Sequence, residues 1–269
     1  MRLFFQMAPV LVTGAISLWG AGCASDHAEA QRLVALQQFS GALRVIDHCL
    51  QLEPRHTSGL VLKGNLLYLL ARDSEATALL EELLKREPGQ ADAHYALGRI
   101  YYFNGRHPQA VAHLETLVRA DPAHYRAWDN LGLALEGVGR IDDAVKAHLK
   151  AIALVATAHR DYDWAYANLA ELLMKQNQNR RAFDLAVEAV ERNPSSGRNA
   201  YLAGKALTRL DQWPKAERWL KRSAELDPKY PEPHYLLGQL LVRTGQRELA
   251  NQEFARFKEL RAAEPEKRR

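Results

Sequence analysis

The stretch from Tyr95 to Pro122, YALGRIYYFNGRHPQAVAHLETLVRADP, decides the fold. Apolar residues spaced three or four apart before Gly105 fit the buried face of one helix, and Gly105 is a typical helix break. The apolar residues after Gly105, among them Leu114, fit a second helix. Pro122 ends this second helix because proline cannot continue it. The stretch therefore predicts two helices joined by a tight turn.

The pattern of this stretch recurs before and after it at a fixed interval. The step from Pro54 to Pro88 equals the step from Pro88 to Pro122, and the step from Pro194 to Pro228 has the same length again. The interval from Pro122 to Pro194 is longer than two such periods by about one helical turn. This turn is inserted between Ala156 and Tyr162. The sequence predicts an array of helix pairs.

The period of about 34 residues, with a small residue such as Gly98 or Gly132 near the middle of each first helix, resembles the tetratricopeptide repeat family. The resemblance implies an all-α fold, a right-handed α-solenoid of about seven helix-turn-helix units. The units are expected at about residues 23–56, 57–90, 91–124, 125–158, 163–196, 197–230 and 231–264, followed by a charged tail at 265–269.

The composition is that of a folded helical protein. Of the 269 residues, 47% are hydrophobic and 25% are charged, which excludes long disordered segments. Alanine, leucine and arginine are abundant and β-branched runs are scarce, which favours helix throughout. The formal net charge of +4 is too small, without a clustered basic patch, to predict nucleic-acid binding.

Residues 1–22 are typical of a secretory signal peptide, because Arg2 precedes a short apolar core that ends in small residues. The residues from Gly20 to Cys23 resemble a bacterial lipobox, in which the cysteine takes a diacylglyceryl thioether after cleavage. That family usually has leucine where Gly20 stands, so ordinary cleavage near Cys23 and an uncleaved membrane anchor are the alternatives. We rank lipidation of Cys23 first.

The residues that follow Cys23 indicate the membrane in which the lipoprotein would be anchored. Ala24 and Ser25 follow Cys23 in place of the aspartate that marks inner-membrane retention in lipoproteins. The resemblance therefore implies an exported, periplasm-facing lipoprotein of the outer membrane. A soluble periplasmic protein and an inner-membrane protein anchored by its signal are the alternatives.

Cys49 falls at a helix-packing position and is expected to be a small buried hydrophobe, with no disulfide if Cys23 carries lipid.

The sequence offers no recognisable catalytic or cofactor motif. None of its ten histidines stand four apart on one helix and no CxxC is present, so no metal site is predicted. A phosphate-cradling glycine loop and a GxSxG elbow are also missing from the sequence. His94 and His234 occupy a packing position of the repeat and are expected to be partly buried. We therefore predict no enzymatic activity and no cofactor.

The resemblance places partner binding in a concave groove lined by the first helix of each unit. The expected groove residues combine cations, aromatic rings and amides: Asn65, Tyr68, Tyr95, Arg99, Tyr102, Arg126, Asn130, Trp164, Asn168, Arg198, Tyr201, Lys205, Arg209, Tyr235 and Arg243. Such a set suits an extended peptide, because arginines bind carboxylates and rings take apolar side chains. Asp129 and Glu171 are the acidic exceptions. The alternative is an ordinary solvated helix face.

These features predict a non-catalytic adaptor of the bacterial cell envelope that binds a protein or peptide partner. A lipobox followed by a run of repeats resembles, in layout, the type IV pilus biogenesis lipoproteins, which implies a role in pilus or secretin assembly. The alternative is an accessory or regulatory subunit of an envelope polysaccharide or peptidoglycan enzyme.

Overall fold

The computed structural model of the chain describes residues 22–263. The expected signal peptide up to residue 21 and the expected tail at 265–269 lie outside the described residues. Within the described range, the length and hydropathy of every helix fall short of what crossing a bilayer requires.

Every regular element in residues 22–263 is an α-helix, and successive helices form pairs joined by short turns, so the all-α prediction is confirmed. The pairs are α1 (Cys23–Ala35) with α2 (Phe39–Leu52), α3 (Thr57–Leu69) with α4 (Asp73–Arg86), α5 (Ala91–Phe103) with α6 (His107–Ala120), α7 (Tyr125–Gly137) with α8 (Ile141–Ala158), α9 (Trp164–Lys175) with α10 (Asn179–Arg192), α11 (Gly197–Arg209) with α12 (Trp213–Leu226), and α13 (Glu232–Arg243) with α14 (Arg247–Ala263).

Each pair turns at one residue with a left-handed backbone. These residues are Gln37, Ala71, Gly105, Gly139, Asn177, Asp211 and Gly245, with φ between 56° and 81°. They recur at the same interval as the prolines, except that the step from Gly139 to Asn177 is longer by about one helical turn. The extra length belongs to α8, which has 18 residues where α6 and α10 have 14. The insertion that the proline spacing indicates is therefore one added turn at the end of a helix.

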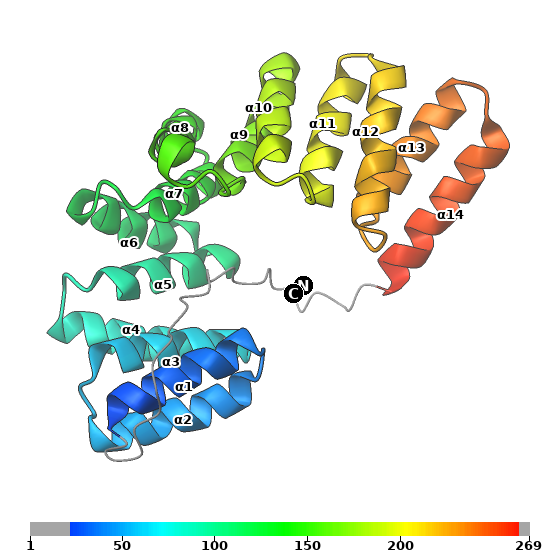
Figure 1. Cartoon of the computed structure of the whole chain (residues 1–269). Coiled ribbons are helices and arrows are strands. Elements are labelled where there is room, and N and C mark those ends of the chain that lie inside the picture. Colours follow the sequence, from blue (N-terminus) through cyan, green and yellow to red (C-terminus); the bar gives the residue numbers. More distant parts are fainter. Residues whose placement is uncertain (1–21, 264–269) are drawn as a thin grey trace. The chain divides into compact units, whose positions relative to one another are not determined.

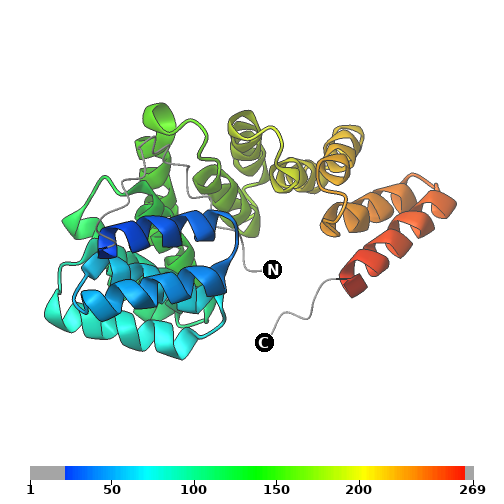
Figure 2. The same ribbon diagram turned by 60° about the horizontal axis from the view of Figure 1, so that its bottom comes forward.

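The helices form two compact units, which divide between Pro122 and Ala123: α1 to α6 form the N-terminal unit and α7 to α14 form the C-terminal unit. Within each unit every helix packs on the next in sequence, from α1 to α6 and from α7 to α14 (Figure 1). Odd-numbered helices of neighbouring pairs also touch: α3 touches α5, α7 touches α9, α9 touches α11, and α11 touches α13. Figure 2 shows the last pairs of the C-terminal unit following one another.

Glycines near the middle of the odd-numbered helices let the two helices of a pair approach closely. A Cβ built on Gly98 would lie only 2.6 Å from Leu114 Cγ, which is closer than real Cβ atoms come to other heavy atoms. Leucines meet glycines in the same way at Gly64 and Gly204. Packing at these points is therefore specific to a residue without a side chain.

Candidate functional site

In each unit the odd-numbered helices that touch one another form a row, which we call the odd-helix row: α3 and α5 in the N-terminal unit, and α7, α9, α11 and α13 in the C-terminal unit. All the residues expected to line a groove belong to these helices. Five of them lie in the N-terminal unit, namely Asn65, Tyr68, Tyr95, Arg99 and Tyr102. The other ten lie in the C-terminal unit, which therefore carries most of the candidate site.

In the N-terminal unit an arginine and three rings lie close together. The guanidinium of Arg99 lies 5.7 Å from the centre of the Tyr95 ring and 5.9 Å from that of Phe103. Tyr68 is buried, and its ring stacks on Phe103 with 6.4 Å between the centroids. Tyr68 is therefore a buried packing residue of the row. Phe103 is exposed on the row, and the sequence did not predict it as a groove residue.

In the C-terminal unit the cations of the row divide into paired and unpaired groups. Lys175 Nζ lies 2.6 Å from Glu136 Oε1, and Arg198 Nη2 lies 3.0 Å from Glu171 Oε2. Four further cations of this row form no ion pair within the described residues: Arg126, Lys205, Arg209 and Arg243. The row therefore carries positive charge that its own carboxylates do not neutralise.

Aromatic rings hold these cations against the row. Arg198 lies over Trp164 at 5.3 Å from the ring centre, Lys205 over Tyr201 at 5.5 Å, and Arg243 over Trp213 at 4.3 Å. Arg126 lies over Tyr125 at 5.5 Å. Contacts between cations and ring faces restrict the long side chains while leaving their hydrogen-bond donors available. Arg209 donates instead to the carbonyl oxygen of Met174.

Burial tunes two groups at the centre of the row. Desolvation lowers the pKa of Lys205 below its ordinary value, against the opposing attraction of Glu171, and Arg209 lowers it further. Burial, with smaller contributions from Glu232 and Glu171, raises the pKa of Tyr201 to about 12. A carboxylate brought next to Lys205 would stabilise its charged form.

Asp129, expected as an acidic groove residue, is 2% exposed and faces the interior, so that expectation is wrong. Its Oδ1 lies 2.8 Å from Nδ1 of His148, and its Oδ2 accepts a 2.8 Å hydrogen bond from the Tyr162 hydroxyl. The amide of Asn168 donates to both carboxylate oxygens at 3.1 and 3.2 Å. A buried carboxylate requires such partners, which explains the inward orientation.

The Asp129 network reaches the row through one amide. Asn168 is 6% exposed, and its Oδ1 accepts a 3.1 Å hydrogen bond from Nη2 of Arg198. Asn168 and Tyr201 are therefore buried supports of the row, whereas Arg198 is half-buried on it. His148 was missed, although the sequence carries a signal: it follows Gly132 at the same spacing at which Leu80, Leu114 and Leu220 follow their own glycines.

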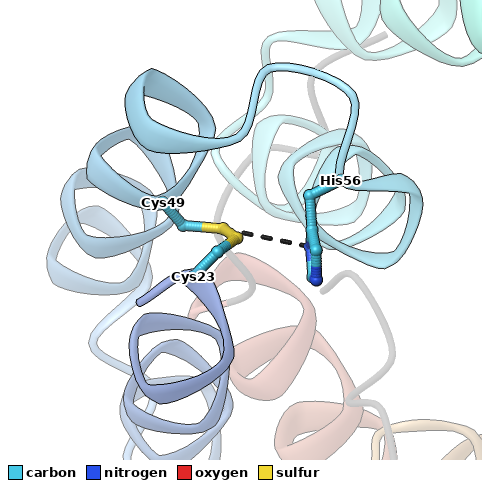
Figure 3. Close-up of side chains that lie close together, drawn as sticks. All are labelled: Cys23, Cys49 and His56. Carbon is cyan, nitrogen blue, oxygen red and sulfur yellow. Dashed lines mark hydrogen bonds between the residues drawn. A yellow bond between two sulfur atoms is a disulfide. The ribbon is translucent and has the colours of Figure 1, made fainter. Parts of the chain in front are cut away.

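A second cluster joins the two cysteines to a histidine. Cys23 at the start of α1 and Cys49 near the end of α2 form a disulfide with 4.3 Å between their Cα atoms, and both side chains are fully buried. Nδ1 of His56, the residue before α3, lies 3.9 Å from Cys49 Sγ (Figure 3). Cys49 is buried as expected, but it is bonded to Cys23 and does not remain a free thiol. Cys23 has a single sulfur atom, which cannot form both this disulfide and a thioether to a lipid.

The same three residues have the donor atoms of a metal site. Sulfur atoms of Cys23 and Cys49 and a ring nitrogen of His56 all lie within 4.8 Å of one another. Neither the spacing of the histidines nor the absence of a CxxC motif indicates this group, because its members are far apart in the sequence. Cys23 followed one helical turn later by His27 was the available signal.

The two histidines expected at packing positions are half-buried, as the repeat register indicates. Nδ1 of His94 lies 3.0 Å from Nδ1 of His113, and Nδ1 of His234 lies 2.7 Å from a carboxylate oxygen of Glu253. Each of these histidines has its partner within its own helix pair.

Comparison with known proteins agrees with this geometry. A family model described as tetratricopeptide repeat matches residues 74–135, and one described as TPR repeat matches residues 204–245. No curated protein matches the chain by sequence.

Several solved structures have the same fold. MamA from Desulfovibrio magneticus RS-1, residues 41 to the end, is 23% identical, with a TM-score of 0.56 over 65% of this chain and 97% of that one. PilF of Pseudomonas aeruginosa is 17% identical, with a TM-score of 0.67 over 77% of this chain and 92% of that one. At these identities the likeness shows a shared fold.

Proposed function

This chain is a tetratricopeptide repeat protein, and we propose that it is a non-catalytic adaptor that binds an extended, acidic segment of a partner protein along the odd-helix row of its C-terminal unit. Proteins of this fold act as interaction scaffolds, and residues remote from one another in sequence share the row. The excess of positive charge on that row selects an acidic partner over a neutral or basic one.

One observation carries the proposal: four cations of the row form no ion pair within residues 22–263. Three of them are held over rings, which fixes their positions before a ligand arrives. Carboxylates of an extended chain would pair with them, and arginine does so with two parallel hydrogen bonds. The exposed ring of Tyr235 on the same row offers apolar contact.

We further propose that the protein works in the cell envelope, facing the periplasm. The apolar segment before Cys23 supports export, and a disulfide between Cys23 and Cys49 suits an oxidising compartment. A lipid anchor on Cys23 is the competing fate of the same sulfur. Pilus or secretin assembly is the pathway that we propose, supported by the resemblance in layout to pilus biogenesis lipoproteins and by the shared fold with PilF.

The test compares three forms of the chain in crosslinked pull-downs from envelope fractions. In the row variant, Arg126, Lys205 and Arg243 are replaced by glutamine. In the control variant, the exposed cations Lys150, Arg218 and Lys258 of even-numbered helices are replaced by glutamine, so both variants lose three charges from the same unit. An acidic partner that the wild type and control capture, and that the row variant does not, supports the proposal.

Binding affinity and thermal stability are measured for the same three forms. Each lost charge is expected to weaken binding roughly tenfold, about 1.4 kcal/mol. Circular dichroism should show unchanged helicity and melting in both variants, because these side chains are at least partly exposed. Equal capture by all three forms would contradict binding along the row.

Pilin or secretin components among the lost partners would support the pathway, whereas a polysaccharide or peptidoglycan enzyme would overturn it.

A further inference from the structure

We propose that Cys23, Cys49, His56 and His27 form a site for a soft divalent cation such as Zn²⁺ when the Cys23–Cys49 disulfide is reduced. Cys23 and His27 belong to α1, Cys49 to α2, and His56 is the residue that caps the start of α3. This proposal is independent of the partner-binding function, because none of its residues lies on the odd-helix row of the C-terminal unit.

The two sulfurs and one imidazole already converge. Donor atoms of Cys23, Cys49 and His56 lie within 4.8 Å of one another, so short side-chain movements after the disulfide opens would place all three around one tetrahedral ion. Figure 3 shows the two cysteine side chains meeting between α1 and α2, with the His56 ring beside them. Two thiolates and imidazole nitrogens are the ligands that Zn²⁺ prefers in proteins.

The tautomer of His56 suits a metal. Nδ1 of His56 accepts a 3.1 Å hydrogen bond from the backbone N–H of Gly59, so in the neutral ring the proton is on Nε2. Nδ1 is also the nitrogen that faces Cys49 Sγ at 3.9 Å. The unprotonated nitrogen that a cation needs is therefore on the side of the ring near Cys49, and a metal would take the place of the Gly59 N–H.

His27, next to His56, would supply the fourth ligand. His27 stands one helical turn after Cys23 on α1, so the two side chains leave the helix on the same face. Its ring centroid lies 5.8 Å from that of His56. Nδ1 of His27 is buried and makes no hydrogen bond within the described residues. A buried polar atom without a partner is unusual, and a metal would satisfy it.

The chemistry balances with a dithiol as reductant. A dithiol gives two electrons and two protons to the Cys23–Cys49 bond and becomes a disulfide itself, which leaves two protein thiols. Zn²⁺ then binds the two thiolates and releases two protons to solvent. Solvent reaches the site at His56, which lines a surface hollow together with Glu53, Pro54, Arg55 and Thr57.

The experiment titrates the full chain with Zn²⁺ alone, before and after reduction, in competition with a chromophoric chelator under anaerobic conditions. One Zn²⁺ per reduced chain, and none per oxidised chain, is expected. Replacement of Zn²⁺ by Co²⁺ should give the charge-transfer absorption of thiolate ligands. A reduced chain that binds no Zn²⁺, or an intact mass with a diacylglyceryl group on Cys23, would overturn the proposal.

Variants separate ligation from folding. His56→Asn keeps a side-chain oxygen that can accept the Gly59 N–H, so the helix stays capped while one ligand is lost. We expect this variant and His27→Gln to bind Zn²⁺ at least about tenfold more weakly. His48→Asn is the control, since His48 adjoins Cys49 in sequence but is exposed and pairs with Asp26. Affinity for Zn²⁺ that His56→Asn leaves unchanged would overturn the site.

Discussion

The imidazole of His148 lies 2.8 Å from the carboxylate of Asp129, and neither side chain is more than 3% exposed. His148 occupies a position where three other helix pairs have leucine against glycine. A Cβ built on Gly132 would meet the His148 ring at 2.6 Å, as one on Gly98 would meet Leu114. A polar ring therefore fills an apolar niche, and the buried carboxylate is what makes this possible.

The Asp129–His148 pair predicts a non-additive pair of substitutions. His148→Leu restores the residue of the other pairs but leaves the Asp129 carboxylate without its imidazole, and we expect it to destabilise the chain by about 3 kcal/mol. Adding Asp129→Asn removes the buried charge and should recover at least half of that loss. Urea denaturation followed by circular dichroism measures both. A double variant as unstable as His148→Leu would attribute the loss to packing of the ring instead.

The turn residues predict a stabilising substitution. Ala71 has φ of 62°, a left-handed conformation that costs a residue with a Cβ about 1 kcal/mol. Ala71→Gly should therefore raise the free energy of unfolding by up to about 1 kcal/mol. Gly105, at the equivalent turn with φ of 71°, provides the matched reverse: Gly105→Ala should destabilise by a similar amount. Changes of the same sign in both variants would contradict this account.

The close approach at Gly98 predicts a compensating pair. Gly98→Ala places a methyl group against Leu114 and should cost roughly 1–3 kcal/mol. In the fifth helix pair Ala170 and Ala186, at the same spacing, are both fully buried, which shows a small residue in place of the leucine. Leu114→Ala should therefore cost less in the Gly98→Ala background than alone. Costs that simply add in thermal and urea unfolding would show that the two positions do not share one contact.

The stability of the N-terminal unit should depend on pH through His113. Burial lowers the pKa of His113 below its ordinary value of 6.5, and the nearby His94 lowers it further. A folded-state pKa below the unfolded value contributes stability that is complete above pH 6.5 and is lost as the pH falls from 6.5 through the folded pKa. The melting temperature should therefore decrease on acidification through this range.

His113→Phe tests the assignment. Phenylalanine keeps a ring next to Tyr101, whose ring centroid lies 5.6 Å from that of His113, but it cannot take a proton. The decrease in melting temperature between about pH 7 and pH 5 should be smaller in this variant than in the wild type. An identical decrease in both would assign the effect to other groups.

Much of the fold could be predicted from local signals. Prolines that end helices and a residue such as Gly105 that breaks them are backbone effects, which act within a few residues and leave a readable period. The excess length between Pro122 and Pro194 located the longer α8 for the same reason. Packing contacts are different, because they depend on which side chains meet across helices.

The errors of the sequence analysis come from such contacts. Asp129 has a groove position in the repeat register, and its contacts with His148, Tyr162 and Asn168, which lie outside its own helix, turn it inward. Cys23 and Cys49 are 26 residues apart, and only the packing of α1 on α2 brings their sulfurs together. The odd-helix row was predictable as a set of residues. Which of its cations form no ion pair with any residue from 22 to 263 was not predictable, because Glu136 and Glu171 pair with cations on other helices.

The disulfide at the first helix pair makes the two ends of the chain unlike. Closing a loop between residues 26 apart removes about 3.5 kcal/mol of chain entropy from the unfolded state. At the other end α14 has 17 residues, of which only Ala250 and Leu260 are buried. Since a repeat array opens from its weaker end, unfolding has a direction, from α14 backwards. A protease that captures the open form would shorten the molecule from its C-terminus and leave the cross-linked pair until last.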